Sequence, residues 1–372
     1  MDLVVRYSEI HKKQGNVRKR FVQTLRQRVQ DKLEFEGLYY GKVAVKPGRI
    51  TVEDTVRDSR VVAELPGVKS CSIAEKTGPE IEEVKKAFPL DFNTSFGVRI
   101  NLRGLEDSSQ DWEEEIGSFV QQETGEEVDL EDPGIWLKAE VTEDHAHVFT
   151  SEDSFEGPGG LPAGVEGKVL SMISGGIDSP VAAFEALKRG LDVTPIYFYD
   201  RPYAAEDHLA RFEAVVRELK RFHPGKDWSY ILVDMEEVNK ALSSVEKGRM
   251  VLHRRAMFKV AERVREERGL DGTVTGESFN QKSSQTPRNL FASSRDLPVF
   301  RPLLNENKVD IQEQACRIGT FEHSKIDSAC KKMVPDSPAT SMDPERLEEL
   351  EKYIGLERLV EQAFESSKEE EI

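Results

Sequence analysis

A buried strand, a glycine turn and the start of a helix follow one another between residues 165 and 184, and this run constrains the fold more than any other. The apolar stretch of residues 165–173, interrupted by Glu166, Gly167 and Lys168, predicts the strand. The string Ser-Gly-Gly-Ile-Asp-Ser-Pro at 174–180 ends it, and we expect Ser179 to be the N-cap of a helix that begins at Pro180. Such a junction binds anions, because glycine lets backbone N–H groups approach a phosphate and the helix dipole favours its charge.

The spacing of this string excludes a Walker loop, which needs Gly-x-x-x-x-Gly-Lys-Ser/Thr and a lysine that this string lacks. It resembles the Ser-Gly-Gly-x-Asp-Ser signature of the pyrophosphatase-loop ATPases, whose members adenylate a substrate and release pyrophosphate. An ordinary glycine-rich turn between a strand and a helix is the alternative interpretation.

Length and composition narrow the class of protein. The 372 residues suffice for two or three domains, and no apolar run reaches the 18 residues that a membrane-spanning helix needs. The N-terminus has no signal-peptide layout and is expected to form a first strand. Three scattered cysteines without a Cys-x-x-Cys pair argue against a disulfide framework, so we expect a reducing, cytoplasmic setting.

Charge is distributed unevenly along the chain. Residues 1–50 carry twelve Lys/Arg and five Asp/Glu, a formal charge of +7, which leaves −24 for the other residues. A basic segment on an acidic protein indicates a local face that binds a polyanion such as RNA. The alternative is the solvated side of an amphipathic helix. The candidate RNA-binding residues are Lys12, Lys13, Arg18, Lys19 and Arg20.

Hydrophobic periodicity predicts a domain order. Residues 1–56 are expected as strand, helix and hairpin, a small α+β unit of ferredoxin type, and 57–155 as a second α+β stretch. A linker rich in glycine and proline, 156–167, leads to 168–340, where strands and helices alternate as in a doubly wound parallel sheet of the α/β class. Residues 341–372 are expected as one acidic helix with a solvated end.

Four strings in the expected order make the chain resemble the tRNA 4-thiouridine synthetases. They are Arg-Tyr-Ser-Glu-Ile at 6–10 with Lys12, Lys13, Gly15 and Asn16; the Gly-Leu-Pro string from 160 that runs into the loop; Thr-Gly-Glu-Ser at 275–278 with Gln281 and Ser-Ser-Gln-Thr at 283–286; and Arg-Pro-Leu at 301–303 with Lys308 and Ile-Gly-Thr at 318–320. The resemblance covers about residues 4–340. It implies that 57–155 is a THUMP RNA-binding domain and that 168–340 is the pyrophosphatase-loop domain.

The resemblance also implies the nucleotide contacts. The ATP-binding residues would be Met172, Ile173, Ser174, Gly175, Gly176, Asp178, Ser179, Tyr197, Phe198, Arg254, Gly276 and Gln285. The segment 197–203 reads Tyr-Phe-Tyr-Asp-Arg-Pro-Tyr where many members have His-Phe-His-Ser-Pro-Pro, so a histidine contact is lost while Tyr197 and Phe198 could stack beside adenine. Core packing for Phe198 and a surface position for Arg254 are the alternatives.

The implied reaction has two steps. The 4-oxygen of uridine, at position eight of tRNA, attacks the ATP α-phosphorus and pyrophosphate leaves; a sulfur nucleophile then displaces AMP. Mg²⁺ would accompany the nucleotide, with Asp178 as its carboxylate and Lys308 as the mobile cation. Cys330 precedes a Pro-x-Ser-Pro string at 335–338 and so matches the family's catalytic cysteine; the adjacent Lys331 and Lys332 would lower the pKa of its thiol. The alternatives are that Asp178 is an acid at a helix start, that Lys308 is a surface lysine and that Cys330 is a buried thiol.

Partners and competing functions complete the expectations. We expect tRNA and a sulfur donor (a persulfide carrier, a cysteine desulfurase or sulfide) as partners, in the family form that lacks a rhodanese domain; a homodimer is an assembly the sequence leaves open. Cys316, in an expected helix at 311–318, is expected in the core, and an iron–sulfur cluster would need three distant cysteines to converge. The competing functions are a 2-thiouridine-forming RNA thiolase, an adenylating synthetase for a small molecule, and a non-catalytic RNA-binding protein.

Overall fold

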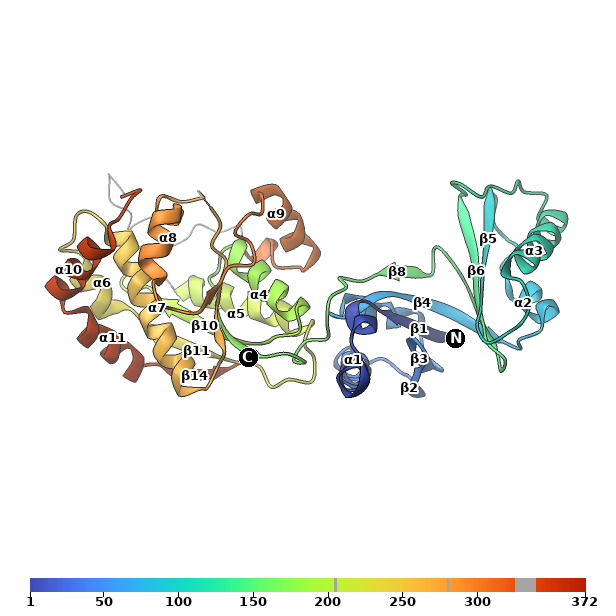
Figure 1. Ribbon diagram of the computed structural model, residues 1–372, viewed down its shortest axis with the longest axis horizontal. Coiled ribbons are helices and arrows are strands. Elements are labelled where there is room, and N and C mark those ends of the chain that lie inside the picture. The colour runs from blue at the N-terminus through green and yellow to red at the C-terminus, as the bar shows by residue number, and fades with distance from the viewer. Residues whose placement is uncertain (204–205, 280, 325–338) are drawn as a thin grey trace. The chain divides into compact units, whose positions relative to one another are not determined.

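The computed structural model describes residues 1–203, 206–279, 281–324 and 339–372. The chain forms two compact units, Met1–Pro162 and Ala163–Ile372 (Figure 1). No helix in the described ranges combines the length and the apolar character needed to cross a bilayer.

The first unit begins with a strand, a long helix and a hairpin. β1 (Asp2–Tyr7), β2 (Lys42–Lys46) and β3 (Arg49–Glu53) form antiparallel pairs, and α1 (Gly15–Phe35) packs beside them. Helical spacing puts Phe21, Leu25 and Val29 on one buried stripe of α1, and this stripe explains why the segment is an amphipathic helix. The strand, helix and hairpin expected from the sequence are confirmed.

A ten-residue strand joins the two halves of this unit. β4 (Val68–Thr77) pairs with β1 and with β8 (Ser154–Glu156) through its first part, and with β7 (Ala146–Thr150) through its last three residues. The sheet order is β2-β3-β1-β4-β7-β6-β5, completed by β5 (Phe96–Leu102) and β6 (Ile135–Val141). β4 was not predicted from the sequence.

Helices and a buried ionic contact complete the first unit. The short 3-10 helix Arg57–Glu64 precedes β4, and α2 (Ile81–Ala87) and α3 (Ser109–Thr124) contribute to a core against β5 and β6. Glu140 of β6 forms ion pairs with Arg6 of β1, at 2.6 Å, and with Arg49 of β3. Glu140 therefore links the two halves of the sheet through charges that are largely withdrawn from water.

The second unit has a mainly parallel sheet. Its order is β13-β12-β9-β10-β11-β14, with β9 (Lys168–Met172), β10 (Asp192–Tyr199), β11 (Ser229–Asp234), β12 (Gly272–Thr275), β13 (Val299–Phe300) and β14 (Lys368–Glu371). Every pairing in it is parallel except that of β11 with β14. The predicted doubly wound α/β fold is confirmed.

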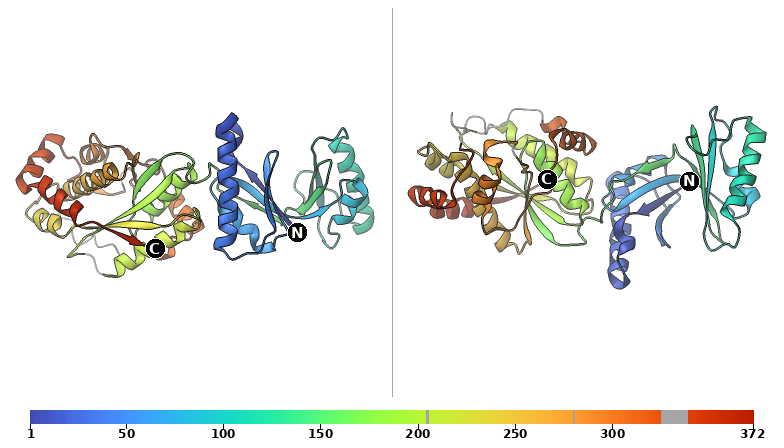
Figure 2. Two further views of the ribbon diagram at one scale, coloured as in Figure 1. Left: turned by 90° about the horizontal axis from the view of Figure 1, so that it is seen from below. Right: turned by 45° about the horizontal axis from the view of Figure 1, so that its top comes forward.

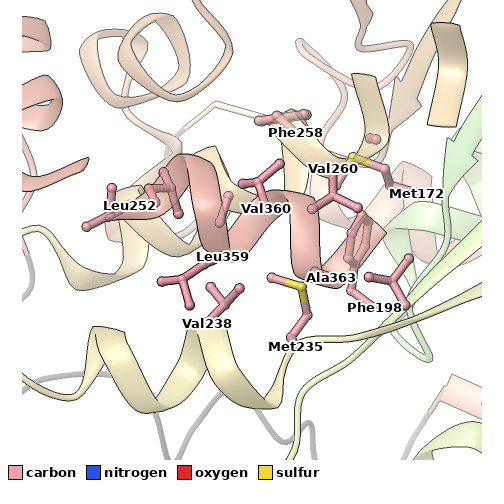
Figure 3. Close-up of a cluster of buried hydrophobic side chains, with 14 of the residues drawn as sticks. Met172, Phe198, Met235, Val238, Leu252, Phe258, Val260, Leu359, Val360 and Ala363 are labelled. Carbon is pink, nitrogen blue, oxygen red and sulfur yellow. The ribbon is translucent and has the colours of Figure 1, made fainter. Parts of the chain in front are cut away.

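Helices cover both faces of this sheet (Figure 2). One apolar cluster contains residues of α4 (Asp178–Lys188), α5 (Glu206–Lys220) and α9 (Lys308–Arg317). The other contains residues of α6 (Glu236–Leu242), α7 (Arg249–Glu267), α8 (Pro287–Ser294), α10 (Pro344–Ile354) and α11 (Leu356–Glu365). In Figure 3, Leu359, Val360 and Ala363 of α11 lie among side chains from the sheet, α6 and α7.

Two local predictions were wrong. Ser179 is not the N-cap: α4 begins at Asp178 with Ile177 in the capping position, and the Ser179 hydroxyl instead accepts the N–H of Ser174. The C-terminal segment is not one helix, because Gly355 adopts a left-handed conformation (φ +65°) that separates α10 from α11, and its end forms β14 on the edge of the sheet.

Candidate nucleotide-binding site

Topology identifies one edge of the second sheet as the place for a ligand. From β9 the chain proceeds through α4 to β10 and through α5 to β11, and then returns by α7 to β12 on the other side of β9. β9 and β12 are thus neighbours whose connections run in opposite directions. In open parallel sheets, ligands bind at the carboxyl ends of two such strands.

The loop after β9 is closed by two serine side chains. The N–H of Ser174 donates to Ser179 Oγ at 2.8 Å, the two hydroxyls are 3.0 Å apart, and the N–H of Gly176 approaches Ser174 Oγ at 3.3 Å. Among the residues described, no acceptor is bonded to the N–H of Gly175 or Ile177. The loop therefore presents donors at the start of α4, the arrangement that binds phosphate.

The residue after β12 packs directly against this loop. A Cβ on Gly276 would lie 2.5 Å from Ser179 N and 2.7 Å from both Asp178 C and Ser179 Cα. Only glycine allows this approach. The third string recognised in the sequence is thereby brought to the first turn of α4.

The fourth string also reaches the loop. Lys308, the first residue of α9, forms an ion pair with Asp178, the first residue of α4. The Ser324 hydroxyl lies within hydrogen-bond distance of two carbonyl oxygens, that of Thr320 at 2.9 Å and that of Gly176 at 3.3 Å. Asp178 and Lys308 therefore lie together beside the glycine turn, and Ser324 is a contact that sequence reasoning missed.

Arg254 lies in an ionic group that sequence reasoning did not find. It forms an ion pair with the buried Glu277, which also accepts from Arg301 Nε at 2.7 Å. Glu277 follows Gly276 at the carboxyl end of β12, so the group lies next to the loop in the chain. Glu277 lies in the third string recognised in the sequence and Arg301 in the fourth, so these strings were the signal that could have identified both residues.

Several buried polar atoms near this edge have no partner among the described residues. They include Gln285 Oε1 and Ser278 Oγ, both on the segment after β12, and Ser171 Oγ on β9. Gln285 ends the 3-10 helix Ser283–Gln285 and is 6% exposed. Buried polar atoms are normally hydrogen-bonded, so such atoms near a ligand edge are candidates for ligand contact.

The aromatic pair on β10 is packed inside the protein. Tyr197 belongs to one apolar cluster and stacks on Phe212 with ring centroids 4.6 Å apart, whereas Phe198 belongs to the cluster on the opposite face. Met172 and Ile173 divide between the same two clusters at the end of β9. The four side chains thus serve packing, and their backbone lies at or near the carboxyl edge.

The cysteines differ in environment. Cys71 is fully buried in the first unit, and burial raises the pKa of its thiol to about 12. Cys316 is exposed, which contradicts the predicted core position: α9 buries Ile311 and Ala315, and Cys316 points about 100° away from Ala315 around the helix. Cys330 lies outside the described residues, so its predicted role as nucleophile stays a prediction.

Asp178 and the basic residues near the start of α1 are the charged groups considered for Mg²⁺ and for RNA, respectively. No group of three or more His, Cys, Asp or Glu side chains suited to a metal occurs in the described ranges. Mg²⁺ on a nucleotide needs only one or two carboxylates besides the phosphates, and Asp178 fits that need. In the first unit, Lys12, Arg18, Lys19 and Arg20 are exposed and Lys13 is half-buried, around the start of α1.

Comparison with known proteins agrees with this geometry. Residues 164–356 match the family model described as thiamine biosynthesis protein (ThiI). A probable tRNA sulfurtransferase of Halobacterium salinarum is 34% identical over 354 residues, covering 91% of this chain and 90% of that protein. One from Thermococcus kodakarensis is 32% identical over 357 residues, covering 90% and 92%.

Solved structures resemble the chain over nearly its whole length. The crystal structure of a 4-thiouridine synthetase–RNA complex with bound ATP has a TM-score of 0.86 and 31% identity, covering all of this chain and 99% of that one. PH1313 from Pyrococcus horikoshii has a TM-score of 0.66 at 21% identity, covering 86% and 99%, and shares the fold. The chain therefore belongs to the ThiI family of tRNA sulfurtransferases, the family of the 4-thiouridine synthetases.

Proposed function

We propose that this protein is an ATP-dependent tRNA sulfurtransferase that converts uridine eight of tRNA into 4-thiouridine. The observation that carries the proposal is the meeting of the Ser174–Ser179 loop with Gly276 and Lys308 at the carboxyl edge of β9 and β12. A relative with 31% identity over the whole chain is a 4-thiouridine synthetase that holds both RNA and ATP.

The loop binds the triphosphate. The N–H groups of Gly175 and Ile177 and the first turn of α4 donate to the pyrophosphate part of ATP. Arg254 adds a positive charge, and Gln285 lies beside the adenosine with its unpaired oxygen. Because their side chains are packed in the core, Met172, Ile173, Tyr197 and Phe198 contact the nucleotide through their backbone.

Charge at the loop activates the α-phosphorus. The 4-oxygen of uridine attacks this atom, and pyrophosphate leaves against the loop. Lys308 lies beside Asp178 and neutralises negative charge that develops on the phosphate oxygens. Asp178 is the residue that would hold Mg²⁺, which supplies further charge neutralisation when bound.

Sulfur then replaces the oxygen. Where sulfide is the donor, HS⁻ adds to carbon 4, AMP leaves with the former uridine oxygen, and a proton is lost. Where a persulfide carrier or a desulfurase is the donor, its sulfane sulfur passes to Cys330 as a persulfide, the terminal sulfur attacks carbon 4 as AMP leaves, and an external thiol reductant cleaves the resulting S–S bond to release 4-thiouridine. The basic residues around the start of α1 bind tRNA phosphates. The proposal also includes the domain limits predicted from the sequence, the THUMP assignment of residues 57–155 and the cytoplasmic setting.

The test uses purified protein with an unmodified tRNA transcript, ATP, Mg²⁺ and sulfide. We expect AMP and 4-thiouridine in equal amounts, measured by chromatography and by mass spectrometry of digested tRNA. A transcript with cytidine at position eight should yield neither. Product at carbon 2 would replace the proposal with the 2-thiouridine function, and ATP binding without any nucleoside change would exclude thiolation by this system.

A further inference from the structure

Glu277 is a buried carboxylate whose two oxygens contact two different arginines. Its side chain is 4% exposed and follows Gly276, the residue packed against the first turn of α4. An ionised carboxylate so far from water is strongly disfavoured unless it is paired and hydrogen-bonded. Its partners therefore decide what Glu277 does.

Arg301 fixes one side of this carboxylate. Arg301 Nε donates to Glu277 Oε2 at 2.7 Å, and Arg301 Nη2 donates to Ser294 Oγ at 2.7 Å. The same guanidinium lies over the ring of Phe258, 5.9 Å from its centroid. With contacts to a carboxylate, a hydroxyl and a ring, Arg301 is bound to the protein body.

Arg254 contacts the other oxygen of the Glu277 carboxylate and has further N–H donors that the described residues do not use. Its Nη1 donates to Glu277 Oε1. Within the described part of the chain, the Arg254 guanidinium makes this one hydrogen bond. A guanidinium has five N–H groups, so donors on Nε and Nη2 are left for a ligand. The side chain is 20% exposed and can reach one.

The three residues form an ordered series. Arg301 is fixed, Glu277 links it to Arg254, and Arg254 keeps donors that can face a phosphate. The group has a net charge of +1, so it attracts an anion although its carboxylate is fully compensated. Without that carboxylate, two guanidinium groups would repel each other at the edge of the site.

We infer that Glu277 is a positioning residue for ATP, which holds Arg254 against the triphosphate while Arg301 holds Glu277. The inference rests on the proposed function, because it takes ATP as the ligand of this edge. It assigns to Glu277 and Arg301 roles that act through Arg254.

The test compares nucleotides with and without phosphates. Glu277→Gln keeps the size of the side chain and removes its charge. With Mg²⁺ present, we expect the Kd for ATP, measured by calorimetry, to rise about tenfold, as expected for a lost charged hydrogen-bond partner. The Kd for adenosine, which has no phosphate, should change less than about twofold.

Glu140→Gln is the matched control. Glu140 is also buried and forms ion pairs with arginines, in its case Arg6, Arg49 and Arg103, but it belongs to the first unit. Both variants should lower the melting temperature, and only Glu277→Gln should weaken ATP binding. Equal weakening of ATP and adenosine binding by Glu277→Gln, or no weakening of either, would overturn the inference.

A double-mutant cycle tests the route through Arg254. If Glu277 acts through Arg254, Glu277→Gln combined with Arg254→Gln should bind ATP no more weakly than Arg254→Gln alone. Additive losses would show that Glu277 acts independently and would overturn the positioning role. Wild-type protein that binds no ATP would remove the proposed function itself, a result distinct from these.

Discussion

Replacement of Gly276 by alanine tests the contact that brings the two halves of the nucleotide site together. The new Cβ would be 2.5 Å from Ser179 N, and since ordinary contact begins at 3.4 Å, the loop or β12 must move by about 0.9 Å. Overpacking of this kind costs about 1–3 kcal/mol of folding free energy. In a unit of this size, each kcal/mol of folding free energy that is lost lowers the melting temperature by about 2–4 °C.

The same displacement should affect catalysis more than stability. The atoms that move are the backbone of Asp178 and Ser179, which carry the loop. A misplacement of about 1 Å in a catalytic site can cost on the order of 100-fold in rate. We therefore expect Gly276→Ala to remain folded at 25 °C and to release AMP about 100-fold more slowly, measured with radiolabelled ATP and tRNA.

A second glycine supplies the control. Gly117 lies in α3, and a Cβ there would be 3.9 Å from Val98 Cγ2, an ordinary contact. Gly117→Ala should raise helix stability by up to about 1 kcal/mol and leave AMP release unchanged. If Gly276→Ala released AMP at the wild-type rate, the close packing of β12 on α4 would have no part in the chemistry and the reasoning would be refuted.

Three further predictions concern charge and thiol chemistry. Lys308→Ala should lower the melting temperature by no more than about 4 °C, because a partly exposed pair contributes at most about 1 kcal/mol, yet reduce AMP formation about 100-fold; a normal rate would remove Lys308 from the reaction. In native protein at pH 8, iodoacetamide should label Cys316 and spare Cys71, whose pKa burial raises to about 12; peptide mass spectrometry reads this, and rapid labelling of Cys71 would contradict it. Hydrogen bonds from Arg268 and Ser229 lower the pKa of Glu369, so its stabilising contribution is present above the unfolded pKa and lost as pH falls through the folded value. The urea midpoint should therefore decrease between about pH 5 and pH 3, and decrease less in Glu369→Gln.

The parallel sheet could be predicted because its strands are apolar on both faces. Val169 and Leu170 are neighbours on β9 and belong to different clusters, and Tyr197 and Phe198 repeat this on β10. Such continuous apolar runs, separated by helical spacing, are typical of strands covered by helices on both sides. The sequence did not reveal how deeply the aromatic pair at the ligand edge is buried: Tyr197 and Phe198 are each 6% exposed, and their stacking beside adenine stays a prediction.

β4 was not predicted because polar residues occur along its whole length and hide the alternation of apolar and polar residues that marks a strand. Its sequence, Val-Lys-Ser-Cys-Ser-Ile-Ala-Glu-Lys-Thr, contains polar residues throughout. Ser72 is nevertheless buried, where it accepts a hydrogen bond from Arg6 at 3.0 Å. Polar residues in a strand can be satisfied by partners distant in sequence, and hydrophobic periodicity carries no information about such partners.

The candidate site shows the same division between local and distant information. The loop at 174–179 was predicted because its chemistry depends on adjacent residues. The pair of Asp178 with Lys308 joins residues 130 positions apart, and Glu277 meets Arg254 and Arg301 across 23 and 24 positions. Family strings indicated that these residues matter, but only the folded sheet shows that a buried carboxylate lies between the two arginines.

The C-terminal strand shows how an edge can override composition. Lys-Glu-Glu-Glu has poor strand propensity and a charge that favours solvent, which is why the segment was predicted as the end of a helix. β11, however, would present unpaired backbone groups at the edge of the sheet, and β14 pairs with them from Ser229 to Leu232. Glu369 gains Arg268 and Ser229 as partners, while the exposed charges of β14 discourage a further strand from joining. The acidic residues that weaken this strand as a local structure therefore make it a suitable last strand of the sheet.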